Sequence, residues 1–277
     1  SQRRRKILGT IAIYLVLLIV VAIILFPFYW MVITSVKIPR EIGRKPVLWP
    51  TVFTWDSYKE LINEKHFFMY MKNSFLVASS VTLISLIISS FAAYSLSRFK
   101  YKFKGVVGRV ILFAYLTPTS LLFIPLSILI ARLQLGNSLY GLILVYLTFS
   151  LPLSTWLLQG YFRGVPRELE EQAMVDGATR LGALFRILLP LSAPGLAAVA
   201  IFTFTGAWNE LLLALIFITS DEKRTVPLGI NYLITSDVLP WGTLMAGAVL
   251  SSLPMICLYF VAQRFMVQGM TSGSVKG

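Results

Sequence analysis

Residues 7–36 read ILGTIAIYLVLLIVVAIILFPFYWMVITSV and contain no charged side chain. A helix needs roughly 20 mostly apolar residues to cross the hydrocarbon core of a bilayer, so this stretch is long enough to span a membrane. It is also far longer than the apolar core of a secretory signal, which has roughly 7–15 residues, and no small-residue cleavage site follows it. We therefore expect a first transmembrane helix that is retained.

The composition of the whole chain agrees with this interpretation. Of the 277 residues, 57% are hydrophobic and only 13% are charged, whereas a soluble domain carries roughly 25% charged residues. The net charge of +13 would indicate nucleic acid binding in a soluble protein, but here it is explained by anchoring charges at membrane interfaces. We expect a lipid bilayer as a partner, and no nucleic acid.

Five further charge-poor stretches follow the first one. They are continuous and do not alternate, which favours helices over the strands of a membrane barrel. We predict an all-α polytopic membrane protein whose six transmembrane helices lie at about 8–34, 73–97, 108–131, 139–162, 190–218 and 243–263. Three prolines are expected to kink their helices: Pro118, Pro125 and Pro152.

The distribution of lysine and arginine predicts the orientation. The N-terminus carries four basic residues and the 98–109 connection carries five, with no acid in either. The 37–72 connection runs against the bias, because it has seven basic residues on the opposite side. Summed over each side of the membrane, the lysine and arginine residues still favour cytoplasmic N- and C-termini in a multi-pass protein of the cytoplasmic membrane. The same orientation places the 163–189 connection in the cytoplasm.

The connection at 165–190 reads VPRELEEQAMVDGATRLGALFRILLP. Pro166 suits a first helical turn because its missing N–H would be unpaired there, and the helix dipole favours the three glutamates that follow. Gly177 can take the left-handed conformation that ends a helix, and Thr179 can cap the next one. We expect a compact cytoplasmic elbow of two short helices that presses against another protein.

Here the chain resembles the permease subunits of bacterial ABC importers. These carry a cytoplasmic EAA loop with the pattern Glu-Ala-Ala, three residues, Gly, nine residues, Ile, one residue, Leu-Pro. Gln172 departs from the middle alanine, but with residue usage of roughly 5–10% the remaining matches have a chance of about 10⁻⁷. The residues in register are Glu171, Ala173, Gly177, Ile187, Leu189 and Pro190.

Other segments resemble the maltose-type carbohydrate permeases in particular. The resemblance runs from about residue 8 to the end and is weakest at 37–72. It is carried by Asn73-Ser74, by AAYSLSRF at 92–99, by AWNE at 207–210 and by GMTSGSVKG at 269–277. It implies the type I ABC importer permease fold with a cytoplasmic coupling helix, and a permease that translocates a mono- or oligosaccharide.

The resemblance also implies a division of the chain. Residues 1–68 would form a first helix with an extracytoplasmic loop, 69–264 the transmembrane domain with its coupling loop at 163–190, and 265–277 a cytoplasmic tail. The coupling residues would be Glu168, Glu171, Gln172, Ala173, Asp176, Gly177, Ala178, Ile187 and Pro190. In the tail, Thr271, Gly273 and Lys276 would contact the ATPase.

The same resemblance implies a set of partners. A second, homologous permease and an ATPase dimer would complete the transporter, and an extracytoplasmic binding protein would contact 37–72 and 220–242. ATP and Mg²⁺ would bind in the partner ATPase, so no cofactor is expected in this chain. This agrees with the sequence, which has no Gly-x-x-x-x-Gly-Lys-Ser/Thr phosphate loop.

Glu210 is the one charge inside an apolar run, and a charge at the bilayer centre costs about 2.5–3.5 kcal/mol. It either lines the translocation path, together with Trp208 and Asn209, or forms hydrogen bonds between helices. Tyr115 and Ser120 on the third helix could bind a sugar through an aromatic face and a hydroxyl, or hold helices together.

No enzyme is expected, because the lone His66 has no plausible catalytic set and no metal-binding partners. Two transport alternatives remain open from the residues. One is an ABC permease for a polar solute other than a sugar. The other is an ion-driven secondary transporter, which would need ionisable residues within the membrane, and Glu210 alone gives this thin support.

Overall fold

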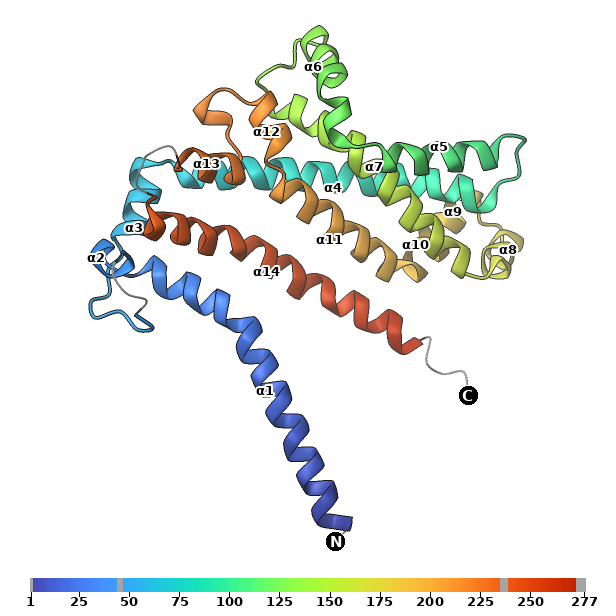
Figure 1. The fold of residues 1–277 in the computed structure, drawn as a ribbon. Coiled ribbons are helices and arrows are strands. Elements are labelled where there is room, and N and C mark those ends of the chain that lie inside the picture. The colour runs from blue at the N-terminus through green and yellow to red at the C-terminus, as the bar shows by residue number, and fades with distance from the viewer. Residues whose placement is uncertain (1, 44–46, 235–238, 273–277) are drawn as a thin grey trace. The chain divides into compact units, whose positions relative to one another are not determined.

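The structure, a computed structural model, describes residues 2–43, 47–234 and 239–272 (Figure 1). Across these residues the chain is helical, without a β-strand, and one isolated antiparallel bridge joins Lys37 to Phe53. The chain divides into two compact units. The first comprises residues 1–67 and 230–253, and the second comprises 68–229 and 254–277.

The first unit is built around a long N-terminal helix. Its elements are α1 (Gln2–Ser35), α2 (Pro39–Ile42), α3 (Asp56–Lys59), the π-helical turn η1 (Glu60–Glu64) and the beginning of α14 (Trp241–Ser272). Most side chains between 11 and 28 on α1 are exposed, as expected for a surface that lipid or another subunit covers. At its end, the Ser35 and Tyr58 hydroxyls lie 2.8 Å apart.

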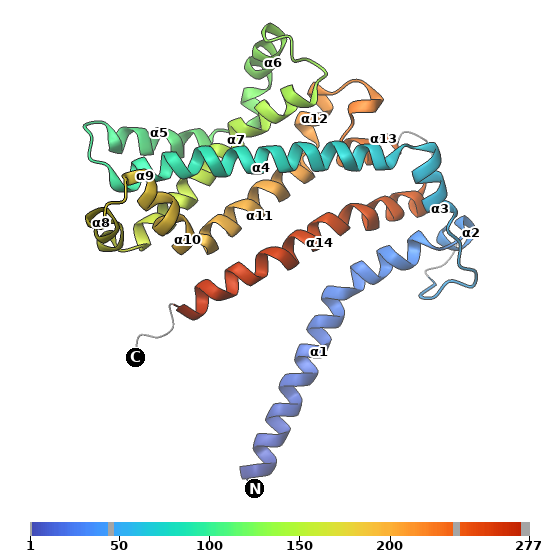
Figure 2. The ribbon, with the colours of Figure 1, turned by 180° about the vertical axis from the view of Figure 1, so that it is seen from behind.

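The second unit contains most of the remaining helices. They are α4 (Phe67–Arg98), α5 (Lys104–Leu116), η2 (Thr119–Leu122), α6 (Phe123–Arg132), α7 (Leu139–Gly164), α8 (Arg167–Val175), α9 (Arg180–Ala183), η3 (Leu184–Leu188), α10 (Leu189–Leu191), α11 (Ala193–Asn209), α12 (Leu212–Phe217), η4 (Asp221–Lys223) and α13 (Val226–Tyr232). Helix α7 is central and packs against α5, α11 and α12. Figures 1 and 2 show α4, α7 and α11 as neighbouring rods.

Two apolar cores hold the second unit together, one near each end of α7. The first joins the beginning of α7 to α4, α6 and α12, with Val81, Leu142 and Leu213 among its buried members. The second joins the end of α7 to α4, η3 and α11, with Leu158, Phe162 and Leu188 fully buried. Because the second core includes η3, it seats the 165–190 connection on the membrane-spanning helices.

Four helices among the described residues are long and apolar enough to cross a membrane. They contain the predicted spans 8–34, 73–97, 139–162 and 243–263. Two further pairs of helices meet at bends of 97° and 77°, and counting each pair as one span gives six. The all-α class is confirmed among the described residues, and the predicted six spans agree with the count that takes each bent pair as one span.

The predicted helices at 108–131 and 190–218 are both broken in the structure, and the kink expected at Pro118 is a complete break. The first breaks at Thr117-Pro118, where Thr117 is extended, because a proline removes an N–H and disfavours helical geometry in the residue before it. The second bends at Ser192 and breaks again at Glu210, where α11 ends before α12 begins. Pro118 thus ends a helix, whereas Pro152 lies inside α7 and Pro125 inside α6.

Candidate functional site: the 165–190 elbow and the helices that hold it

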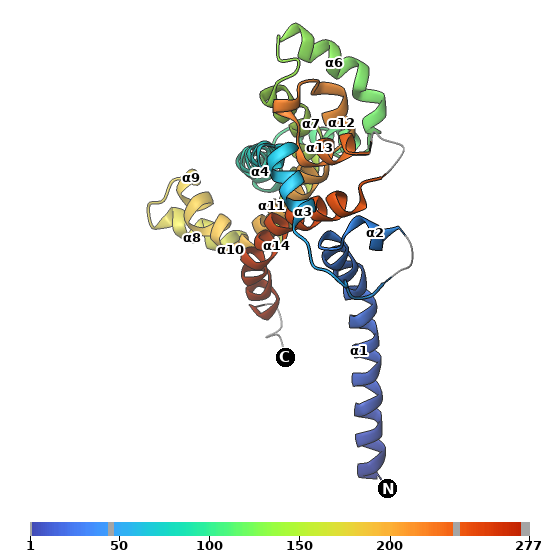
Figure 3. The same cartoon turned by 90° about the vertical axis from the view of Figure 1, so that its left-hand side faces the viewer.

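The 165–190 connection folds as the sequence predicts. Helix α8 begins directly after Pro166 and ends before Gly177, whose φ of 90° lies in the left-handed region that a side chain disfavours. Thr179 caps the next helix, because its hydroxyl accepts a hydrogen bond of 3.0 Å from the Gly182 N–H. Figure 3 shows α8, α9 and α10 grouped at one edge of the second unit.

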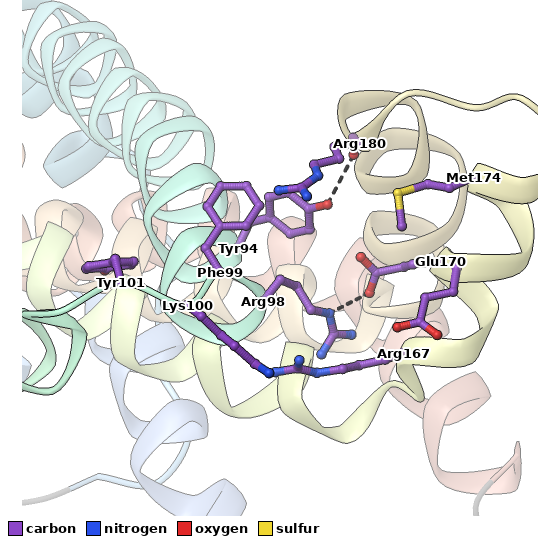
Figure 4. A pocket seen from close by; sticks show the side chains of 10 residues that line it. Tyr94, Arg98, Phe99, Lys100, Tyr101, Arg167, Glu170, Met174 and Arg180 are labelled. Atoms are coloured by element: carbon purple, nitrogen blue, oxygen red, sulfur yellow. Dashed lines mark hydrogen bonds and ion pairs between the residues drawn. The ribbon is translucent and has the colours of Figure 1, made fainter.

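A buried ion pair joins α8 to the end of α4. Arg98 Nε lies 2.6 Å from Glu170 Oε1, and the two side chains are only 9% and 5% exposed (Figure 4). Arg98 Nη2 also donates to the Val165 carbonyl at 2.9 Å. The Glu170 carboxylate and the Val165 carbonyl, both on the elbow, therefore accept hydrogen bonds from Arg98, the last residue of α4. Glu170 was not among the predicted coupling residues, although it lies next to Glu171.

Two further hydrogen bonds link the elbow to the same end of α4. Arg167 Nη2 donates to the Ser97 carbonyl at 2.8 Å, and the Tyr94 hydroxyl donates to the Arg180 carbonyl at 3.1 Å. Arg180 also lies over the ring of Phe99, 5.4 Å from its centroid. With the ion pair, these contacts form what we call the α4 clamp, which joins the elbow to the end of α4.

A cavity of about 600 Å³ lies between the clamp and the 99–101 segment, as Figure 4 shows. Its walls combine aromatic rings with basic groups. They include Tyr94, Arg98, Phe99, Lys100, Tyr101, Arg167, Glu170, Glu171, Met174 and Arg180. The clamp therefore borders open space.

The outer face of α8 combines acidic and apolar groups. Val175 is 88% exposed and Met174 is 37% exposed, although both are apolar. The predicted coupling residues Glu168, Glu171, Gln172, Asp176, Gly177 and Pro190 are exposed, while Ala173, Ala178 and Ile187 are half-buried. An apolar tip between carboxylates can insert into a pocket with a basic rim. The coupling role of the predicted residues stays a prediction.

The cavity that contains Glu210 lies inside the second unit, where α4, α7 and α11 meet. It measures about 190 Å³ and is lined by Val81, Thr119, Tyr146, Phe149, Ser150, Leu153, Phe202, Thr203, Gly206, Ala207, Glu210 and Leu213. Glu210 occupies the break after α11, and its Oε1 accepts a 2.9 Å hydrogen bond from the Leu213 N–H of α12. The carboxylate therefore satisfies a backbone donor that the helix break leaves without an intrahelical partner.

The other predicted path residues lie outside this cavity lining. Trp208 is 2% exposed and stacks on Phe204 with ring centroids 5.6 Å apart. Asn209 is exposed, and its amide donates to the Thr205 carbonyl at 3.0 Å. Tyr115 and Ser120 are exposed. The structure brings Glu210 together with Thr119 and Tyr146, and the path role of all five predicted residues stays a prediction.

At the opposite end of α4, side chains fix the 219–226 connection. The Tyr70 hydroxyl donates to Asp221 Oδ1 at 2.7 Å, and the Asn73 amide donates to the carbonyls of Glu222 and Arg224 at 2.8 and 2.9 Å. The Ser74 hydroxyl accepts from the Val226 N–H at 2.7 Å. The Asn73-Ser74 pair therefore has a structural task, which is to hold this connection against α4.

Most of the expected binding-protein surface at 37–72, up to residue 67, falls in the first unit. A cavity of about 960 Å³ there is lined partly by carboxylates and a tryptophan, including Asp56, Glu60, Glu64 and Trp241. Glu60 Oε2 accepts from the Thr243 hydroxyl at 2.8 Å. Residues 44–46 and 235–238 of the two expected contact segments lie outside the described residues.

Two remaining predictions concern the tail and metals. Thr271 belongs to the last turn of α14, whereas Gly273 and Lys276 lie outside the described residues. In the part of the chain that the structure describes, no group of three His, Cys, Asp or Glu side chains could hold a metal ion. The tail contact with an ATPase stays a prediction.

Comparison with known proteins places this geometry in a family. Residues 67–272 match the model of the "binding-protein-dependent transport system inner membrane component". The chain is 36% identical over 278 residues to the trehalose/maltose transport system permease protein MalG of Thermococcus litoralis, covering 99% of both chains. It is 37% identical over 254 residues to the sulfoquinovosyl glycerol transport system permease protein SmoH of Agrobacterium fabrum, covering 91% of this chain and 89% of that one.

The diacetylchitobiose uptake system permease protein DasC of Streptomyces coelicolor is 37% identical over 257 residues and is covered to 92%, as is this chain. Among solved structures, a bacterial ABC transporter involved in the import of the acidic polysaccharide alginate has a chain of the same fold. The two superpose with a TM-score of 0.78 at 22% identity, over 94% of this chain and 96% of that one.

Proposed function

This chain belongs to the family of inner membrane components of binding-protein-dependent transport systems, and from this we propose that it is the permease subunit of an ATP-driven carbohydrate importer. The solute would be a mono- or oligosaccharide. Support comes from full-length relatives whose names give trehalose and maltose, sulfoquinovosyl glycerol, and diacetylchitobiose as the transported compounds. Membership of this family also sets the ion-driven alternative aside.

The α4 clamp carries the mechanical part of the proposal. A separate ATPase dimer would bind ATP and Mg²⁺ and receive α8, with the apolar tip at Val175 in a pocket and Glu171 beside a basic group. Because Glu170 is paired with Arg98, displacement of α8 pulls directly on the end of α4. The same displacement reaches α11 through η3 and α10, since η3 packs against α8 and α10 packs against α11.

Alternating access then follows from two positions of this rigid elbow. When the ATPase dimer closes on ATP, the helices attached to α8 would move and open the cavity near Glu210 outward, and hydrolysis would reset them. A second permease would supply the other wall of the path. A solute-binding protein would deliver sugar at the 37–72 and 220–242 segments, with both termini in the cytoplasm.

Uptake by a strain that lacks this gene tests the proposal. Radiolabelled sugars from a panel that includes di- and trisaccharides are compared with a dipeptide and an amino acid. We expect loss of uptake for at least one sugar and unchanged uptake of the other solutes. In cells with the intact gene, depletion of ATP should stop sugar uptake, whereas an ionophore that collapses ion gradients at constant ATP should not. Normal uptake of every sugar would refute the carbohydrate assignment.

A further inference from the structure

A basic groove lies between the beginning of α5 and the end of α7, outside the elbow and the Glu210 cavity. It encloses about 410 Å³, and its cations are Lys104, Arg109 and Arg163. No acidic residue is among the described residues that line it. Lys104 Nζ donates to the Phe99 carbonyl at 3.0 Å, which fixes one cation at the mouth. Three like charges in one groove repel one another, so an anion bound among them would relieve the repulsion.

The groove becomes apolar along its length. Leu112 of α5 and Trp156 of α7 complete its wall, and both are exposed, at 37% and 51%. Trp156 precedes Arg163 by seven residues, which is about 10 Å along a helix. Leu112 follows Lys104 by eight residues, or about 12 Å. Lys104 and Arg163 lie at one end of the groove and the apolar side chains lie about 10 Å deeper, which matches the length and polarity of a phospholipid from phosphate to upper acyl chain. Arg109 lies between these two levels, one turn before Leu112, and its long side chain can extend towards the phosphate.

The surroundings favour lipid over a soluble protein as the occupant. Val106, Val110 and Phe113 on α5 are 47%, 59% and 74% exposed, and they lie in a segment that forms half of a candidate membrane span. A soluble subunit that filled the groove would have to cover this apolar surface at the depth of the bilayer.

The groove has room for a ligand because of its glycines. A Cβ built at Gly105 or at Gly108 would meet no atom within 4 Å, so the surface beside both residues is open. Gln159 adds a polar group between Arg163 and Trp156, at the level where a glycerol backbone would lie. We infer that this basic groove binds an anionic phospholipid, with the phosphate held by Lys104, Arg109 and Arg163 and the acyl chains lying along Leu112 and Trp156.

Lipid retention by the assembled transporter tests this inference. The complex is purified in nanodiscs that contain equal amounts of phosphatidylglycerol and phosphatidylcholine, and bound lipids are counted by native mass spectrometry. We expect the wild type to retain phosphatidylglycerol in preference to phosphatidylcholine. Each cation near a membrane surface strengthens anionic lipid binding roughly fivefold, so Arg109→Gln with Arg163→Gln should weaken retention about 25-fold.

Two further variants separate the site from general charge effects. Lys102→Gln with Arg186→Gln also removes two positive charges, but from exposed positions outside the groove, and it should leave lipid retention unchanged. Gly108→Leu fills the open space without altering any charge, and it should also release the lipid. Equal retention by the wild type, the groove double variant and Gly108→Leu would overturn the inference. So would a groove variant that keeps its lipid but loses the second permease or the ATPase, because the groove would then be a protein contact.

Discussion

Replacing Glu170 with glutamine keeps the size of the side chain but removes the negative charge that neutralises Arg98. The guanidinium would then lie at the end of α4 with 9% of its side chain exposed and no carboxylate beside it. Its second bond, to the Val165 carbonyl, would remain. The variant therefore tests the ionic part of the α4 clamp without deleting the side chain that fills the space.

The structure sets the size of the expected effect. Removing one partner of a buried ion pair costs about 3–5 kcal/mol, because the other charge is left buried and uncompensated. Glutamine can still accept a hydrogen bond from Arg98 Nε, so the lower end, about 3 kcal/mol, applies here. That corresponds to a shift of about 150-fold between the clamped and released positions of α8.

Two assays measure the consequence. Equilibrium unfolding of the purified assembled transporter should show a loss of about 3 kcal/mol for Glu170→Gln. The ratio of sugar transported to ATP hydrolysed in proteoliposomes should fall, because a released α8 no longer moves α4. Glu168→Gln is the matched control for stability alone: it removes an exposed carboxylate from the same turn and should change the unfolding free energy by less than about 0.5 kcal/mol.

A double variant decides whether pairing is the cause. Arg98→Met with Glu170→Met removes both charges, and such replacements of buried pairs are often neutral. The unfolding free energy that Arg98→Met and Glu170→Met each lose as single variants can be added to predict the loss in the double variant. We expect the double variant to be more stable than this sum predicts, by about 2 kcal/mol. Additive effects, or an unfolding free energy of Glu170→Gln equal to that of the wild type, would refute the reasoning.

Three other predictions follow from single positions. Gly177→Ala should destabilise the elbow by about 1–2 kcal/mol and lower sugar uptake, because φ of 90° is unfavourable for a side chain, and unchanged uptake would argue against a rigid elbow. Gly195→Ala should cost about 1–3 kcal/mol in unfolding free energy, because a Cβ built there lies 2.4 Å from Tyr161 Cγ. Gly160→Ala is the control and should carry no such cost, since a Cβ built there meets nothing within 4 Å. Equal effects of the two substitutions would contradict the packing of α11 on α7. Burial lowers the pKa of Lys37 against the opposing effect of Glu41, so the folded protein holds this proton less tightly than the unfolded chain, and the unfolding free energy should rise as the pH rises from the folded-state pKa towards 10.5. Denaturant titrations at two pH values should show this rise in the wild type but not in Lys37→Met.

The sequence predicted the elements of the elbow because each depends on local chemistry. Pro166, Gly177 and Thr179 act through their own backbone or a neighbour three residues away, and all three lie where the pattern placed them. The spans were predictable for the same reason, since an uncharged apolar run carries its signal along the chain. The breaks inside two spans were less predictable: Pro118 indicated a kink but not the bend of 97°, and no signal indicated the bend of 77° at Ser192.

The clamp was not predictable, since it depends on contacts between distant segments. Glu170 and Glu171 are adjacent and identical, yet Glu170 is 4% exposed and paired with Arg98, 72 residues earlier, while Glu171 is exposed. Helical spacing places Glu170 and Ala173 on one face, which is the one local signal that could have separated the two glutamates. In the same way, Glu210 was singled out by its charge, but its bond to the Leu213 N–H follows from a helix break that the apolar pattern does not reveal.

The most direct test of the proposed coupling role is to label the tip of α8. Cys257 is the only cysteine, so Val175→Cys in a Cys257→Ser background gives one thiol at a position that is 88% exposed. A membrane-impermeant maleimide should not label intact cells. It should label inverted vesicles stripped of the ATPase, and rebinding of the ATPase should block that labelling. Labelling of intact cells, or labelling that the bound ATPase leaves unchanged, would contradict a cytoplasmic α8 that docks on the motor.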